Sequence, residues 1–282
     1  MRPAHAGAAA VSAAAFALAG CGSSSEAAKP APARTDAVPV LLYHQLGERS
    51  PYSVALDDFR AQLDELRDRG YRTISLAQYQ AWLAGSPLPV SRPILITFDD
   101  GFASQAKAGP ELAARAFSAV LFVVTGFASG PSRYWMSWDQ LRRLEATGRW
   151  ELAFHAGAHG HVPLHSPCKD FYVCRLPGES LAAYERRVTE EVAAGTRVLS
   201  RQIPGWSHVA WAAPYDAAGQ FAGDSNDPRI PGWVSRFFAD RFSVVFLEDR
   251  ARGLNRRYRF QVKGSTTLTD FRAALGDAAF GR

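Results

Sequence analysis

Residues 93–101 read PILITFDDG: an apolar segment that ends in two adjacent carboxylates and a glycine. An apolar run of this length, bounded by proline and glycine, is typical of a buried strand. The neighbouring anions Asp99 and Asp100 repel each other unless a cation, a substrate or solvent compensates them. The end of this strand is therefore a candidate functional site.

The rest of the chain repeats this strand pattern, with segments of helical periodicity between the strands. We expect strands at 38–44, 71–76, 93–98, 118–125, 150–155, 208–214, 242–247 and 258–263. We expect helices at 56–70, 110–117, 137–148, 180–200 and 233–240, and a last helix from about 267. Six or more such repeats favour a β/α barrel over an open sheet. In such folds functional side chains gather at the carboxyl ends of the strands.

Histidines follow another expected strand end. His155 and His159 are four residues apart, close enough to bind one metal ion whether the turn is helical or irregular. With one aspartate they form a set of two imidazoles and one carboxylate that leaves positions open for water. His161 is an alternative second ligand. Taken alone, the pair is better explained as surface histidines of a glycine-rich loop.

The two aspartates need not have the same role. Consecutive strand residues face opposite sides, and Gly101 allows the chain to turn sharply after Asp100. We expect one carboxylate to bind a metal and the other to take a proton from the attacking water. The metal expected first is zinc, which lowers the pKa of bound water to about 7. Cobalt and nickel accept the same ligands.

Three motifs carry a family resemblance: TFDDG at 97–101, the spacing of the two histidines, and Ala213-Pro214-Tyr215. They resemble the motifs of the NodB-like polysaccharide deacetylases, carbohydrate esterase family 4. The resemblance covers roughly 38–270, and the segments 38–44 and 53–76 look most like the branch that deacetylates poly-N-acetylglucosamine. It implies a distorted (β/α)7 barrel. The implied roles are catalytic base for Asp99, metal ligand for Asp100, His155 and His159, and oxyanion donor for the backbone amide of Tyr215.

Three positions depart from that family pattern. Ala212 stands where many relatives have an arginine that tunes the base, and Ala156 replaces the small hydroxyl residue usual after the first metal histidine. No histidine follows His208, so the late histidine that acts as general acid in many relatives has no counterpart. The general acid is therefore unassigned from the sequence.

We expect an enzyme that uses a metal ion to remove acetyl groups from N-acetylglucosamine units of an extracellular polysaccharide. That N-acetylated glycan is the expected binding partner. One alternative is a peptidoglycan deacetylase, and another is a weakly active or inactive carbohydrate-binding lipoprotein of the same fold. His44 is a candidate substrate-binding residue because it ends the first expected strand, near the barrel mouth. Trp135 and Trp138 are candidates because aromatic faces suit the apolar faces of sugar rings. A structural histidine and core packing of the aromatic side chains are the alternatives.

The N-terminus has the pattern of an export signal. Residues 1–20 combine a short basic start with an apolar stretch too short to span a membrane comfortably, and small residues precede Cys21. Leu-Ala-Gly-Cys resembles the bacterial lipobox, in which Cys21 is lipidated. Residues 21–37 are rich in Ser, Ala and Pro and are expected to be a flexible tether before a deacetylase domain at 38–282. We therefore expect an exported lipoprotein on the outer face of the cytoplasmic membrane, or on the periplasmic side of a membrane.

Composition limits the remaining function classes. A 282-residue chain with 47% hydrophobic residues can bury a full core, and a net charge of +5 is too small to indicate nucleic-acid binding. The basic run 250–263 is expected to be a solvated surface, with contact to an anionic polymer as the alternative. Cys168 and Cys174 favour a disulfide in an oxidising compartment, with two free thiols as the alternative. The sequence does not indicate an oligomeric state.

Overall fold

The structure is a computed structural model. It describes residues 35–130, 132–157, 175–176, 178–207, 209–214, 229–247 and 257–276. All of these residues belong to one unit, Pro32–Arg282. Within these ranges, every helix is too short or too polar to cross a membrane. The expected signal segment, Cys21 and most of the tether lie outside the described residues.

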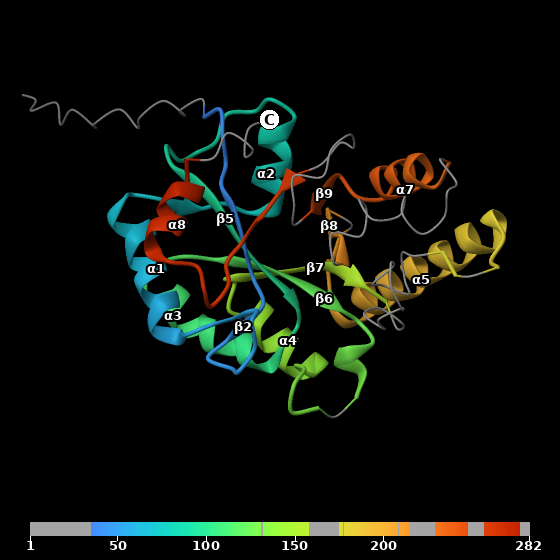
Figure 1. Cartoon of the computed structure of the whole chain (residues 1–282), viewed down its shortest axis with the longest axis horizontal. Helices are drawn as coiled ribbons and strands as arrows, with labels where there is room; N and C mark the ends of the chain where they lie inside the picture. Colours follow the sequence, from blue (N-terminus) through green and yellow to red (C-terminus); the bar gives the residue numbers. More distant parts are fainter. Residues whose placement is uncertain are drawn as a thin grey trace, which may run out of the picture. The chain divides into compact units, whose positions relative to one another are not determined.

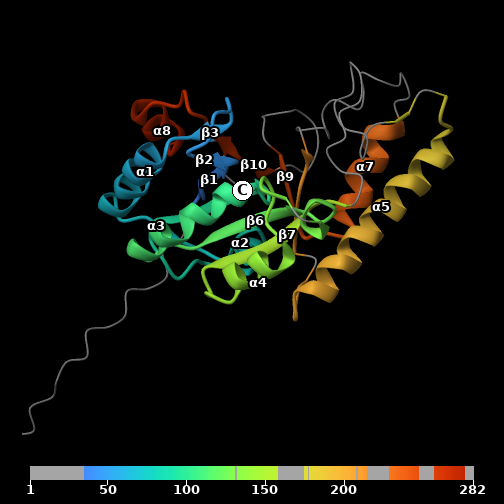
Figure 2. The ribbon, with the colours of Figure 1, turned by 90° about the horizontal axis from the view of Figure 1, so that it is seen from below.

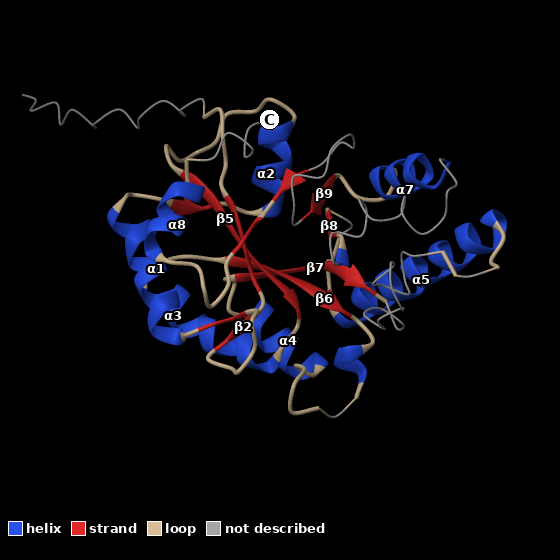
Figure 3. Cartoon of the chain, viewed as in Figure 1, coloured by secondary structure: helices blue, strands red, loops and turns tan. Residues whose placement is uncertain are grey.

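A parallel sheet runs through the described part of the chain (Figures 1 and 3). Its main strands are β1 (Val40–Tyr43), β5 (Pro93–Asp100), β6 (Ala119–Val124), β7 (Trp150–Ala156), β8 (Ala210–Ala212), β9 (Val244–Leu247), β10 (Arg257–Tyr258) and β11 (Phe260–Gln261). Their order is β10-β9-β8-β7-β6-β5-β1-β11. The short β4 (Arg72–Thr73) pairs with the start of β5, while β2 (Gln45–Leu46) and β3 (Ser53–Val54) pair with each other.

The last strand segment closes the sheet into a barrel. Arg259 alone separates β10 from β11, yet β10 pairs with β9 and β11 pairs with β1. Residues 257–261 therefore join the two edges of the sheet. Around the described ring, the positions are β1, β5, β6, β7, β8, β9 and the joint β10–β11 segment. The distorted seven-stranded β/α barrel expected from the sequence is confirmed.

Helices cover the outside of the sheet. They are α1 (Leu56–Asp68), α2 (Leu76–Leu83), α3 (Ala108–Ala114), α4 (Trp138–Glu145), α5 (Leu181–Gln202), α7 (Arg229–Ala239) and α8 (Leu268–Ala274), with 3₁₀ turns η1 (Ala103–Lys107) and η2 (Phe127–Ser129). Helices α1, α3 and α8 lie together on one side, and α5 and α7 lie side by side on the other (Figures 1 and 2). Ser137 and Gln140 form a reciprocal capping box at the start of α4, which confirms the serine cap expected there.

The structure differs from the expected elements at three places. Strand β5 runs to Asp100, two residues beyond the expected end, so both carboxylates belong to the strand. Helix α3 begins at Ala108 instead of Pro110. Helix α2 was not expected, because residues 71–76 have the composition of a strand. A capping box between Ser75 and Gln78 begins this helix and ends the extended segment.

Residues of each strand alternate between the barrel interior and the helix layer. On β5, Leu95 belongs to the interior cluster, whereas Ile96 and Phe98 pack in the cluster beneath the helices. The same alternation sends Asp99 inward. On β7, Ala153 is interior, so His155 also faces inward. The sheet pleat therefore points an aspartate and a histidine from two strands into one interior.

Candidate active site

Asp99 is a fully buried carboxylate that pairs with a fully buried arginine. Both side chains have an exposed fraction of 0%. Arg259 Nη1 donates to Asp99 Oδ1 and Nη2 donates to Oδ2, each at 2.7 Å. The guanidinium also lies over the rings of Phe122 and Phe246, with 5.3 and 5.9 Å to the ring centroids. The fork of donors fixes the plane of the carboxylate inside the barrel.

Charge around Asp99 sets its protonation state. Burial by itself would raise the pKa of Asp99, but the charges of Arg259, His155 and His44 and the hydrogen bonds from Arg259 outweigh it. The pKa of Asp99 is therefore held below its ordinary value. The carboxylate is ionised at neutral pH although it is excluded from water.

His155 lies beside both aspartates. Its Nε2 is 3.4 Å from Asp100 Oδ1 and 3.8 Å from Asp99 Oδ2. Its Nδ1 is 2.8 Å from the carbonyl oxygen of Ala212. Because a carbonyl only accepts, Nδ1 carries the hydrogen and donates it. In the neutral ring, Nε2 therefore presents its lone pair toward Asp100.

This arrangement fits the ligand chemistry of a divalent metal. A lone pair and a carboxylate oxygen that face each other favour a cation between them, and a backbone acceptor on the other ring nitrogen is typical of metal-binding histidines. Asp100 and His155 are thus two suitable ligands. Within the described residues, no group of three or more His, Cys, Asp or Glu side chains could hold an ion. The expected third ligand, His159, and its rival His161 lie outside the described residues.

The backbone is unusual where the carboxylates meet the following turn. Asp100 has φ of +82° and Gly101 has φ of +89°, so both residues are in the left-handed region. For a residue with a side chain this conformation costs about 1–2 kcal/mol, and such residues concentrate at functional sites. The chain therefore begins to turn at Asp100, one residue before Gly101. The strained backbone of Asp100 sets the direction of its own carboxylate.

His44 approaches Asp99 from the opposite side of β5. It follows β1, and its ring is half-buried, with the centroid 5.6 Å from that of Tyr52. Its Nδ1 is buried and has no hydrogen-bond partner among the described residues. The charge of His44 also contributes to the lowered pKa of Asp99. An imidazole is thus within electrostatic reach of the buried carboxylate.

Residues 89–219 match the family described as polysaccharide deacetylase. This segment of the chain is a polysaccharide deacetylase domain. The matched segment includes both aspartates and His155, whereas His44 and Arg259 lie outside it.

Several known proteins are similar to this chain in sequence or in fold. The structure of IcaB from Ammonifex degensii is 27% identical with a TM-score of 0.65, covering 86% of this chain and 96% of that one. A de-N-acetylase from Aggregatibacter actinomycetemcomitans shares the fold at 20% identity, with a TM-score of 0.67 and coverage of 85% and 100%. The poly-beta-1,6-N-acetyl-D-glucosamine N-deacetylase of Escherichia coli K12 is 27% identical over 195 residues. That alignment covers 60% of this chain but only 29% of the relative, so the chain spans less than a third of its length.

Arg259 corrects two expectations about the deacetylase domain. We expected no arginine beside the base, because Ala212 occupies the usual position, and we expected the run 250–263 to be solvated. Instead, Arg259 comes from the closing strand segment and is completely buried against Asp99. Its position in the expected strand 258–263, between Tyr258 and Phe260, was the available signal. The inward or outward orientation of that strand could not be read from the pattern.

The tryptophans expected to bind sugar pack within the deacetylase domain. Trp138 is 8% exposed and belongs to the core. Trp135 stacks on Phe102 and on Phe127, with ring centroids 4.3 and 4.2 Å away. Core packing, the alternative to sugar stacking, describes Trp138, whereas Trp135 is partly exposed and its expected contact with sugar stays a prediction. Because Phe102 follows Gly101, the Trp135 stack supports the turn after the carboxylates.

Several expected site residues lie outside the described residues and stay predictions. They are the lipidation site Cys21, the second histidine His159 and its rival His161, the cysteines Cys168 and Cys174, and Tyr215.

Proposed function

We propose that this chain is a metal-dependent hydrolase that removes acetyl groups from N-acetylglucosamine units of an extracellular polysaccharide, with poly-N-acetylglucosamine as the expected polymer. The name of the Escherichia coli relative supports this substrate class. The observation that carries the proposal is the ionised, buried Asp99 beside Asp100 and His155.

Asp100 and His155 would hold the metal together with His159, or with His161 in its place. When bound, the ion would supply Lewis acidity and a water of lowered pKa. Zinc is the expected metal, with cobalt or nickel as alternatives, because the same ligand types accept all three.

Asp99 would act as the general base. Its lowered pKa keeps it ionised, and Arg259 holds both oxygens in place, so it is ready to accept a proton as water attacks the acetamide carbon. The new C–O bond forms as the carbonyl electrons move to the oxygen, which the backbone amide of Tyr215 would stabilise. The C–N bond then breaks, leaving acetate and an amine.

We assign the proton of the leaving amine to His44. In the described part of the chain, His155 already donates from Nδ1 to Ala212 and lies against Asp100, whereas His44 has a buried Nδ1 with no partner. Arg259 and His44 together supply the two functions whose apparent loss suggested an inactive carbohydrate-binding protein. They favour the active enzyme over that alternative.

Acetate release from β-1,6-linked N-acetylglucosamine oligomers tests the proposal. We expect Asp99→Asn and His44→Gln each to lower kcat by about 10²- to 10⁴-fold, the usual contribution of a general acid or base. We expect chelation to abolish turnover and added zinc to restore it. Asp57→Asn is the control, because the Asp57 side chain is 93% exposed on α1. Equal background release from the wild type and Asp99→Asn would remove the proposal for this polymer, and a parallel assay on peptidoglycan would test the alternative substrate.

We further propose that a lipid on Cys21 holds the domain outside the cytoplasmic membrane. The lipobox-like ending of the N-terminal segment supports this location. We expect the wild type to sediment with membranes and Cys21→Ser to be released into the soluble fraction. Equal membrane association of both would exclude the anchor.

A further inference from the structure

The strands that carry His44 and Asp99 stop pairing just before those residues. Strands β1 and β5 run in parallel register from Val40 opposite Leu95 to Tyr43 opposite Phe98. His44 and Asp99 are the next residues on the two strands, beyond the last registered pair. The registered pairing therefore ends one residue before His44 and Asp99, which do not form a registered pair with each other.

The side chain of Gln105 bridges this position. From η1, its Nε2 donates to the carbonyl oxygen of His44 at 2.7 Å and to that of Asp99 at 2.5 Å. The orientation of the amide is unambiguous, because both partners are carbonyls that only accept. The side chain is completely buried. One amide group thus joins the backbone of the two strand ends.

The other half of the Gln105 amide makes no comparable bond within the described part of the chain. Its Oε1 is buried without a hydrogen-bond partner among the described residues, which costs about 1–3 kcal/mol. An apolar side chain of similar length would avoid that cost but would donate no hydrogen bond. Neighbours on η1 reinforce the link, since Ser104 Oγ accepts from the backbone of Leu46 and Lys107 donates to its carbonyl.

We propose that Gln105 is a positioning residue that sets the distance between His44 and Asp99. The inference rests on the proposed function, in which these residues act as acid and base. Gln105 touches only their backbone and contacts no reacting atom. Its loss leaves both side chains present but lets the ends of β1 and β5 separate.

The kinetic test compares two buried glutamines. Gln105→Met removes both donors, and Gln105→Asn keeps the amide but is one methylene too short to reach both carbonyls. The matched control is Gln62→Met, because Gln62 is also buried and binds β1, but through the hydroxyl of Tyr43 at 2.9 Å. We expect both Gln105 variants to lower kcat about 10- to 100-fold with KM nearly unchanged, as for a misplacement of about 1 Å. We expect Gln62→Met to lower Tm while kcat stays at the wild-type value.

A second measurement separates this inference from the proposed function. The ring signals of His44 in ¹H–¹⁵N spectra report its environment whether or not the polymer is a substrate. We expect them to shift in Gln105→Asn and to stay in place in Gln62→Met. Unshifted His44 signals in a folded Gln105→Asn protein, or a kcat equal to that of the wild type, would overturn the positioning role. If the wild type released no acetate but the His44 signals still shifted in Gln105→Asn, only the proposed function would be refuted.

Discussion

Asp99 is a carboxylate with no exposure to water, and one arginine keeps it charged. Desolvation of a carboxylate in a protein interior costs several kcal/mol, so an ionised buried aspartate needs a partner of opposite charge. Arg259 supplies both charge and geometry through two hydrogen bonds. At the scale of single residues, the base of the proposed reaction is therefore a pair: Asp99 accepts the proton and Arg259 determines at which pH it is able to do so.

Arg259→Met should change both pH dependence and stability. Without the guanidinium, burial dominates and the pKa of Asp99 rises. Because the base must be deprotonated, the acid limb of kcat/KM should move to higher pH, and the free energy of unfolding should fall by about 3–5 kcal/mol. A pH–rate profile and a denaturant titration measure these effects.

Two further variants keep the Arg259 prediction testable. Arg259→Lys retains the charge without the fork of donors, so its acid limb should move less. Arg272→Met is the control, since the Arg272 side chain is 46% exposed on α8 and binds Glu65. An acid limb that stays in place in folded Arg259→Met would show that Arg259 does not tune the base.

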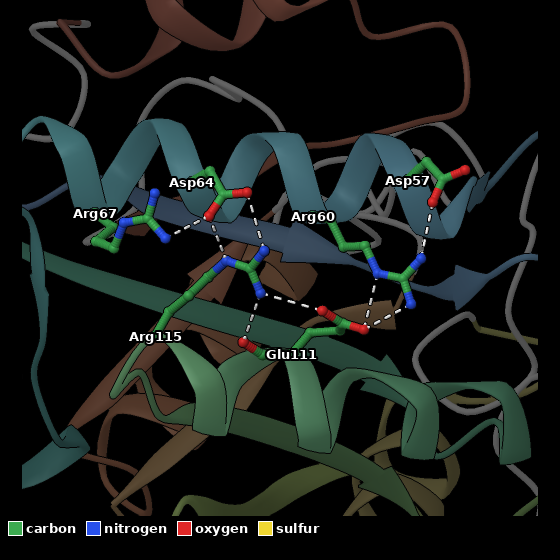
Figure 4. Close-up of polar contacts among 6 residues, drawn as sticks. All are labelled: Asp57, Arg60, Asp64, Arg67, Glu111 and Arg115. Atoms are coloured by element: carbon green, nitrogen blue, oxygen red, sulfur yellow. Dashed lines mark hydrogen bonds and ion pairs between the residues drawn. The ribbon is translucent and has the colours of Figure 1, made fainter.

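Helices α1 and α3 are joined by a chain of ion pairs (Figure 4). Arg115 donates to both oxygens of Asp64 at 2.8 and 3.0 Å, and its Nη1 also binds the backbone and side chain of Glu111. Arg60 connects Glu111 to Asp57 on the first turn of α1. The Arg115 side chain is 10% exposed, so it is screened less by water than the other members. The centre of this network, not its ends, should stabilise the helix pair.

Arg115→Met should lower the free energy of unfolding by about 1–3 kcal/mol, because its hydrogen bonds are to charged groups in a poorly solvated position. Arg67→Met is the matched control. Arg67 also binds Asp64, at 2.8 Å, but is 49% exposed, so its loss should be below about 1 kcal/mol. Urea unfolding of the two variants measures the difference. Equal losses would show that burial does not distinguish the two arginines.

At the start of helix α2, strand-favouring residues and a helix-capping motif lie next to each other in the sequence. The segment 71–76 contains β-branched and aromatic residues that favour a strand. Only two of its residues pair, in β4, and the helix begins at Leu76. The capping box at Ser75 satisfies backbone donors of the first helical turn, and the carboxylate of Glu151 accepts from the Leu76 amide. The serine and glutamine three residues apart were the local signal for this start.

The whole molecule is held together by contacts between distant parts of the chain. The closing segment 257–261 pairs with β1 at one edge and β9 at the other. The same segment places Arg259 against Asp99, which lies 160 residues earlier. The same short segment therefore closes the barrel and completes the candidate site.

Acid should unfold the molecule below about pH 4. The carboxyls whose pKa is lowered in the folded chain are Asp64, Glu65, Asp99, Glu111, Glu179 and Asp270. Hydrogen bonds from Arg272 and Arg69 lower the pKa of Glu65 to about 2. A carboxyl with a lowered folded pKa stabilises the fold above its unfolded pKa, and this stabilisation is lost as pH falls through the folded value.

Urea midpoints at pH 7, 5, 4 and 3 test this acid dependence. We expect little change from pH 7 to 5 and a steep fall from pH 4 to 3. Glu151 acts in the opposite sense, because burial raises its pKa, so it is more easily protonated in the folded chain. A midpoint that stays constant down to pH 3 would contradict the prediction.

The sequence by itself determined the barrel class, the deacetylase motifs and the positions of Asp99 and His155 at the ends of two expected strands. All of these are local: apolar runs alternate with helical periodicity, and the acidic pair and His155 each lie at the carboxyl end of a strand. Such patterns depend only on near neighbours in the chain. They are visible before any partner is known.

Only the tertiary structure decided which distant groups meet. Arg259 reaches Asp99 because residues 257–261 close the barrel, Gln105 bridges two strand ends, and Trp135 stacks on aromatic rings from two other segments. Sequence periodicity predicts that a side chain faces the barrel interior, but it does not predict which side chain lies opposite. The physical reason is that the role of a buried charge or amide depends on the groups it contacts. Those groups are brought together only when distant strands close the barrel.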